Sequence, residues 1–194
     1  MSQPSSSSIG APGDEAGGEI LPTVAKNAII EQLTGKPPRG ASTPEAIGYL
    51  AEKAGVFVTL RDKKSGELRG CVGSVEPKCE NLLEETRQSA CLAAFEDERF
   101  PPVKDRRQLN KLDIEVSVLS EPERVDSIIE LDPEIYGVIL TATKRGVRGV
   151  MLPNVPDLNT VDKQLAAIRR KAGLRPDERL KIERFRVEKF RDAE

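Results

Sequence analysis

A strand-like segment with two glycines limits the fold of this chain more than any other feature. It reads Leu68-Arg69-Gly70-Cys71-Val72-Gly73-Ser74. Glycine inside a strand offers no side chain to pack, so it marks a bulge or a place where something approaches the backbone closely. The run 55–61 before it alternates in polarity, and turn residues at 62–66 join the two segments, which predicts a β-hairpin. The glycine-bearing segment is then the return strand of that hairpin.

The same strand offers a candidate reactive thiol. In a regular strand Arg69, Cys71 and Gly73 share one face, because side chains alternate. A guanidinium favours the thiolate, and the thiolate is the nucleophilic form of cysteine. Cysteine is also among the most often buried residues, so a lone cysteine in a strand is more often part of the core than a catalyst. Both interpretations stay open at this point.

The rest of the chain alternates helix and strand patterns without a regular βαβ order. Periodicity and capping residues predict helices at 19–33, at 161–172 (Thr160 as cap, Gly173 as terminator), and up to about 96 from either Pro77 or an Asn81 cap. Strands are expected at 114–119, in a second hairpin of 137–143 with 147–152, and as one closing strand from 180 to 190. The pattern favours an α+β fold, mainly antiparallel sheet with packed helices.

Residues 1–18 are rich in Ser, Pro and Gly and are predicted to form a disordered tail. Residues 19–192 are expected to form a single domain. Within it, 68–72 is echoed in outline by 147–151, where Arg148 takes the place of Arg69. Five residues are a short match, and chance accounts for it as well as duplication does.

Composition excludes several classes of function. The 30 basic and 32 acidic side chains nearly cancel, which argues against nucleic acid as a partner. The chain has no histidine, which removes Ser-His-Asp and Cys-His pairs. Its three cysteines lack CxxC spacing and are too few for an all-cysteine zinc site, so neither a metal nor a cofactor is expected. No bilayer-length apolar run or signal peptide is visible, and we expect a cytoplasmic protein without a membrane partner.

Acidic clusters give a weaker signal. Glu96-Asp97-Glu98 falls at the end of a predicted helix, where adjacent side chains do not face one another. The sequence therefore predicts that these carboxylates lie at the surface.

Several segments together resemble a known family. These are GVFVTL, LRGCVGS, ERFPPV, IEVSVLS with EPE, DPEIYGV, RGVMLP and ERFRVEKF. They are similar to the AMMECR domain family, called AmmeMemoRadiSam system protein A in prokaryotes, over about 19–192. The resemblance implies an intracellular α+β protein with one larger and one smaller lobe. It also implies association with Memo-like and radical SAM proteins, but it brings no agreed activity.

The site hypothesis thus depends on the chemistry of the LRGCVGS strand. We expect it to bind a small anionic ligand or a partner protein. The candidate ligand-binding residues are Arg69, Gly70, Gly73, Ser74 and, if the two Arg-Gly strands converge, Arg148. The alternative is an enzyme in which Cys71 is a nucleophile activated by Arg69, with a carboxylate such as Glu115 as the remaining type of base. The sequence leaves open whether the protein is an enzyme.

Overall fold

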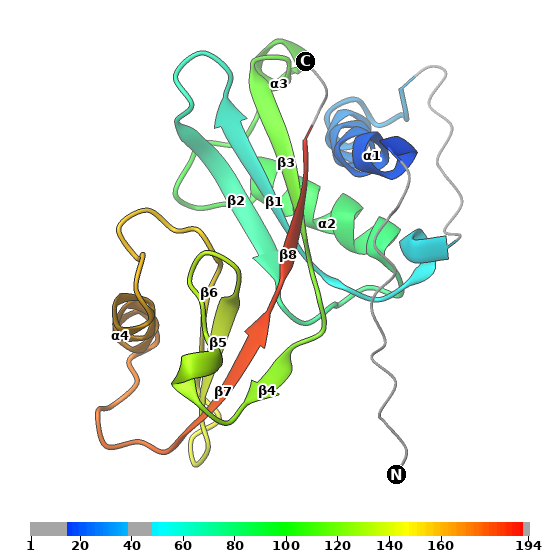
Figure 1. Ribbon diagram of the computed structural model, residues 1–194. Helices are drawn as coiled ribbons and strands as arrows, with labels where there is room; N and C mark the ends of the chain where they lie inside the picture. The colour runs from blue at the N-terminus through cyan, green and yellow to red at the C-terminus, as the bar shows by residue number, and fades with distance from the viewer. Residues whose placement is uncertain (1–14, 39–47, 192–194) are drawn as a thin grey trace. The chain divides into compact units, whose positions relative to one another are not determined.

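The chain divides into two compact units, each with its own sheet and core. In the computed structural model, residues 15–38 and 48–191 are described. The first unit runs to Val118 and resumes at Lys189, and the second unit is Leu119–Glu188. Figure 1 shows the two sheets and the helices that accompany each of them.

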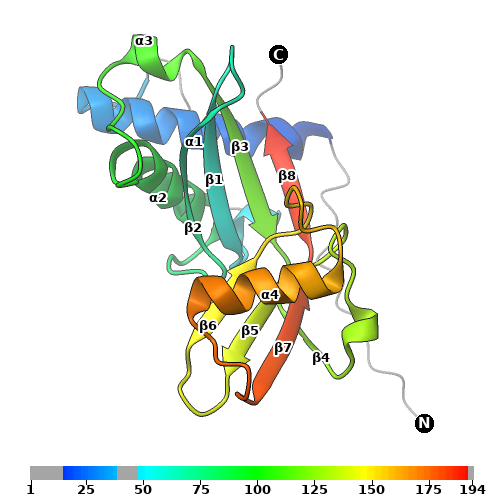
Figure 2. The same cartoon turned by 90° about the vertical axis from the view of Figure 1, so that its left-hand side faces the viewer.

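The first unit is a four-stranded sheet covered by helices. Its strand order is β2-β1-β3-β8, and the bounds are β1 Gly55–Asp62, β2 Leu68–Ser74, β3 Leu112–Leu119 and β8 Val187–Arg191. Helix α2 (Leu82–Phe95) packs on β1 and β2, and helix α1 (Glu15–Thr34) packs on α2 (Figure 2). Apolar side chains of all these elements form one buried core. Two short helical segments, η1 (Gly48–Ala51) and α3 (Arg106–Leu109), complete the unit.

The predicted first hairpin is confirmed, and its inner glycine explains how the helix fits. Strands β1 and β2 are antiparallel, with Thr59 opposite Cys71. A Cβ atom on Gly70 would lie 2.2 Å from the carbonyl oxygen of Ala93 in α2. Ala93 lies on the buried side of α2, together with Ala90 and Ala94. Gly70 therefore allows the backbone of α2 to lie directly against β2.

The second unit is also a four-stranded sheet with a helix on it. Its order is β4-β7-β5-β6, and the bounds are β4 Glu123–Val125, β5 Gly137–Ala142, β6 Arg148–Met151 and β7 Leu180–Phe185. A short turn of 3-10 helix, η2 (Ile128–Glu130), follows β4. Helix α4 (Val161–Ala172) packs on β5 and β6, with Thr160 as its N-cap and Gly173, at φ 61°, as its C-cap. Both caps agree with the sequence prediction.

The two units repeat one chain path. In each, a hairpin is followed by a helix and then by a strand that lies beside the first strand of the hairpin: β1-β2-α2-β3 and β5-β6-α4-β7. The sequence echo occupies equivalent positions, because a Cβ on Gly149 would lie 2.6 Å from Cγ2 of Ile168 in α4. A shared packing requirement, a helix close over a glycine of the return strand, therefore accounts for the Arg-Gly echo.

The α+β class with mainly antiparallel sheets is confirmed, but some boundaries differ from the expectation. The single closing strand at 180–190 is wrong: β7 and β8 belong to different sheets and are separated at Arg186. Ser120 donates its N–H to the Arg186 carbonyl (3.0 Å) and accepts the Arg186 N–H on its hydroxyl (2.9 Å), which holds the chain at this break. Residue polarity along 180–190 carries no sign of that contact.

Two smaller differences concern helix ends. Helix α1 begins at Glu15, so residues 15–18 are helical instead of part of the predicted tail; residues 1–14 lie outside the described part. Each residue added to a nucleated helix gains one hydrogen bond, which lets the helix continue through glycine. Of the two predicted starts of helix α2, the Asn81 cap is confirmed and the Pro77 start is wrong: the Asn81 side chain accepts the Glu84 N–H, and Cys79 precedes the helix. No helix in the described residues is long and apolar enough to cross a membrane.

Candidate functional site

Two motifs noted in the sequence, LRGC (68–71) and RFPP (99–102), meet at the outer edge of the first sheet. Strand β2 is an edge strand, and the segment that follows α2 lies along it. Asp97 accepts the backbone N–H of Cys71 (2.8 Å), and the Nη2 atom of Arg99 donates to the Cys71 carbonyl (3.1 Å). Arg69 donates through Nη2 to the carbonyl of Pro101. The RFPP segment thus covers the LRGC strand, and side chains satisfy both backbone groups of Cys71.

Asp97 and Arg99 form the central ion pair of this site. The Arg99 Nε and Nη2 atoms donate to the two carboxylate oxygens of Asp97 at 2.9 Å and 2.7 Å. The hydrogen bond from Arg99, followed by the backbone N–H of Cys71, lowers the pKa of Asp97 to about 2, although its burial acts in the opposite direction. The surface prediction for Asp97 is wrong, because only 6% of its side chain is exposed. Asp97 lies past the end of α2, where the helix spacing rule no longer applies.

Arg99 keeps donor capacity after these contacts. Its side chain is 58% exposed, and its guanidinium lies 5.3 Å from the centroid of the Phe100 ring. Among the described residues, Nη1 has no hydrogen-bond partner. The hydrogen bond to Asp97 raises the pKa of Arg99, and the negative charge of a Cys71 thiolate acts in the same direction with a smaller effect. Arg99 is therefore a fixed, partly free cation that interacts electrostatically with Cys71.

Cys71 is half-buried on the strand face opposite to Gly70 and α2, as the alternation predicts. The hydroxyl of Thr59 on β1 donates to its Sγ atom at 3.4 Å. Neither Asp97 nor Glu115, the carboxylate named from the sequence, fits the role of a base for Cys71. Asp97 bonds the Cys71 backbone and has a pKa of about 2, and Glu115 is paired with Arg191 at 2.6 Å on β8.

The remaining candidate residues lie in different surroundings. Gly70 is buried beneath α2 and has a packing role against that helix, whereas a Cβ on Gly73 would lie 2.0 Å from the Val56 carbonyl oxygen, so Gly73 has a packing role within the hairpin. Ser74 is half-buried at the end of β2. Arg148 is exposed and belongs to β6 of the second unit, whereas Arg69 belongs to the first.

Sequence reasoning missed Asp97 and Arg99, which contact Cys71 more directly than Arg69 does. The available signal was the ERFPPV segment, one of those that carry the family resemblance. Asp97 and Arg99 lie two positions apart in the turn that follows α2, and there the guanidinium reaches back to the carboxylate. That turn follows from the C-terminal end of α2 at Phe95.

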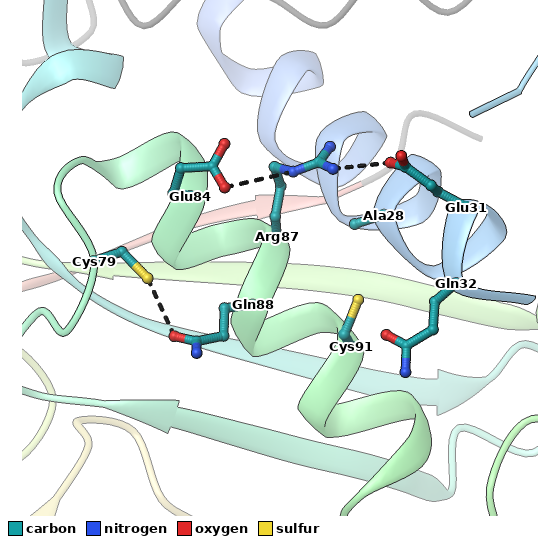
Figure 3. A pocket seen from close by; sticks show the side chains of 8 residues that line it. All are labelled: Ala28, Glu31, Gln32, Cys79, Glu84, Arg87, Gln88 and Cys91. Atoms are coloured by element: carbon teal, nitrogen blue, oxygen red, sulfur yellow. Dashed lines mark hydrogen bonds and ion pairs between the residues drawn. The ribbon is translucent and has the colours of Figure 1, made fainter. Parts of the chain in front are cut away.

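The other two cysteines line a separate hollow of about 390 Å³ between α1 and α2. Figure 3 shows Cys79 beside Gln88, and the Cys79 Sγ atom donates to the Gln88 side-chain oxygen at 3.1 Å. Cys91 lies on α2, three residues after Gln88. Burial raises the pKa of both thiols, and for Cys79 the charge of Glu85 adds to this effect. These thiols are therefore protonated at neutral pH and are poor nucleophiles. All three cysteines are free.

The part of the chain that the structure describes contains no group of three His, Cys, Asp or Glu side chains that could hold a metal ion. The arrangement at Cys71 consists of backbone, thiol, hydroxyl, carboxylate and two guanidinium groups. These groups can bind an anion, or the thiol can act as a nucleophile.

Comparisons with known proteins cover nearly all of the described fold. The AMMECR1 family model matches residues 22–190. A protein of Thermotoga maritima is 42% identical over 151 residues, which is 77% of this chain and 83% of that protein. A longer protein of Clostridium acetobutylicum is 38% identical over 175 residues, 88% of this chain but 35% of that protein. The crystal structure of the uncharacterised protein PH0010 from Pyrococcus horikoshii is similar with a TM-score of 0.76 and 34% identity, over 92% of each chain.

Proposed function

The chain belongs to the AMMECR1 family, and from this premise we propose that it binds a small anionic ligand at the covered edge of β2. Arg99 and Arg69 supply the positive charge, and Cys71 lies beside the bound ligand. The observation that carries the proposal is the Arg99 guanidinium, which Asp97 holds in place through two hydrogen bonds while Nη1 stays free among the described residues.

The charge and geometry of the two arginines favour an anion. A guanidinium fork matches a carboxylate or a phosphate, and it loses little conformational freedom on binding when it is already held. Arg69 also keeps Nε and Nη1 without partners in the described residues. Asp97 neutralises one of the two positive charges, so the site retains one net positive charge.

A small ligand fits this edge better than an added strand from a partner protein. Strand addition needs free N–H and C=O groups along the edge. At Cys71 both groups are already bonded to Asp97 and Arg99. We therefore favour the ligand over the partner among the two occupants expected from the sequence.

Thiol chemistry at Cys71 is a second candidate function, and two contacts favour it. The Thr59 hydroxyl donates to the sulfur, and Arg99 interacts with the thiolate charge. Both groups stabilise a thiolate. In this version Arg99 takes the activating role that the sequence assigned to Arg69.

Alkylation of Cys71 tests both candidates. Iodoacetamide, which is uncharged, is applied to the folded protein with inorganic phosphate or succinate, or with sodium chloride at equal ionic strength, and the three cysteines are quantified by peptide mass spectrometry. We expect phosphate or succinate to slow alkylation of Cys71 saturably while Cys79 and Cys91 are unaffected. Arg99→Lys keeps the charge but loses the fork, and should weaken this protection about tenfold. Arg106→Gln, an exposed arginine on α3 of the same unit, should leave it unchanged.

The outcomes separate the candidates. Equal alkylation rates in phosphate, succinate and chloride would contradict the anion site. If Cys71 in that case reacts fastest of the three and its rate titrates below the free-thiol pKa of about 8.5, thiol chemistry is the better assignment. If Arg106→Gln weakens protection as much as Arg99→Lys, the effect is one of overall charge and the site assignment is wrong.

Family membership alone supports two broader proposals. One is that this chain associates with Memo-like and radical SAM proteins, which co-purification from the native cell would test. The other is that it functions in the cytoplasm, where three free thiols persist.

A further inference from the structure

A second concave site lies in the second unit and shares no residue with the Cys71 site. It is a pocket of about 330 Å³ between the β5–β6 turn and the loop that follows α4. Six charged side chains line it, four of them basic: Lys144, Arg145, Arg175, Arg179, Asp177 and Glu178.

One ion pair builds this pocket and uses up two of the charges. Glu178 accepts hydrogen bonds from Nε and Nη2 of Arg145 and from the backbone N–H of Arg175 (2.8 Å). Arg145 also donates through Nη2 to the Gly173 carbonyl at 3.1 Å. These contacts lower the pKa of Glu178 to about 2, with the Arg145 hydrogen bond as the main cause. Arg145 and Glu178 therefore join the turn to the loop and neutralise each other.

Hydrogen bonds to the backbone carbonyls of Arg175 and Arg179 hold the loop after α4 in place. Thr143 donates its N–H and its hydroxyl to the Arg179 carbonyl, each at 3.1 Å, and Arg169 donates to the Arg175 carbonyl at 3.1 Å. Within residues 15–38 and 48–191, the side chains of Arg175, Arg179 and Lys144 form no hydrogen bond or ion pair.

Three exposed cations around one pocket repel each other unless an anion lies between them. The lining has two acidic side chains. Glu178 is paired with Arg145, so Asp177 is the one negative charge that remains in the lining. The unneutralised lining therefore carries a net positive charge of two.

We infer that this pocket binds a small molecule that carries a diphosphate or a similar group with at least two negative charges. Arginine forks bind phosphate oxygens through paired hydrogen bonds, and Lys144 adds a point charge from the turn. A concave pocket of this volume suits a small ligand. A nucleic-acid strand instead requires an extended basic surface, and the chain as a whole has a net charge of −2.

Site-resolved NMR titration with inorganic pyrophosphate tests the inference on the full chain. We expect saturable shifts of the backbone amides at 143–146 and 173–179. The double variant Arg175→Ala/Arg179→Ala leaves the Arg145–Glu178 pair and the backbone contacts in place, and should weaken this binding at least about tenfold. The matched control is Arg170→Ala/Lys171→Ala, which removes equal charge from the exposed last turn of α4. It should bind pyrophosphate within about twofold of the unaltered chain.

Three results would overturn the inference. The first is the absence of saturable shifts at 143–146 and 173–179. The second is equal weakening in the control double variant, which would indicate bulk charge. The third is tight binding of a single-stranded oligonucleotide at these amides without any pyrophosphate binding, which would indicate a polymer ligand. Because the readout is confined to these amides, none of them bears on the Cys71 site.

Discussion

Replacing Asp97 by asparagine isolates the ion pair that holds the β2 edge. Asparagine keeps an acceptor for the Cys71 N–H but loses the charge that faces Arg99. The pKa of Asp97 falls from its ordinary value of 3.8 to about 2 in the folded protein. At about 1.4 kcal/mol for each pH unit, this lowering corresponds to about 2 kcal/mol of folding free energy at neutral pH.

The sign of the pH dependence follows from the direction of the pKa change. A lowered pKa means that the folded state favours the carboxylate, so the stabilisation is complete above about pH 4 and is lost as pH falls through about 2. Asp97→Asn lacks this titration. The free energy difference between the two proteins should therefore be about 2 kcal/mol at pH 7 and shrink steadily between pH 4 and pH 2.

Urea unfolding followed by circular dichroism at pH 7, 4, 3 and 2 measures this difference. Asp113→Asn is the matched control, because Asp113 is 62% exposed and its nearest partner, the Nζ atom of Lys63, lies 3.7 Å away. Such exposed pairs contribute about 0–1 kcal/mol. A difference for Asp97→Asn that stays constant with pH, or that equals the Asp113→Asn difference, would refute the reasoning.

Three further predictions concern packing, capping and thiol reactivity. Gly70→Ala should lower the free energy of unfolding by about 3 kcal/mol, since its Cβ would meet the Ala93 carbonyl of α2, and urea unfolding would measure this; a change below 1 kcal/mol would contradict the contact. Asn81→Ala should cost about 1 kcal/mol by the same assay, through loss of the cap to the Glu84 N–H, and an unchanged stability would show that the cap contributes nothing. Alkylation of Cys91 should still accelerate above pH 9, because burial raises the pKa of that thiol; a plateau below pH 8.5 would be inconsistent with burial as the cause.

Half of the candidate site could be predicted from local pattern. Two glycines in a strand indicated a close approach at Gly70, and alternation placed Arg69 and Cys71 on the opposite face; the structure agrees with both. The assignment of Arg69 as the arginine beside the thiol came from adjacency on one face. In the folded chain Arg69 reaches the Pro101 carbonyl, and Arg99 is the guanidinium that interacts with Cys71.

Local signals alone determined the elements of this protein. Caps at Asn81 and Thr160, the terminator Gly173 and the alternation of both hairpins act over a few residues, so the sequence predicts them before any tertiary contact exists. Tertiary structure decided which strands share a sheet, where the segment 180–191 breaks, and that Asp97 is buried against Cys71, 26 residues earlier in the chain. Those outcomes depend on which distant backbone groups need partners at a sheet edge, and residue polarity along the chain does not record that need.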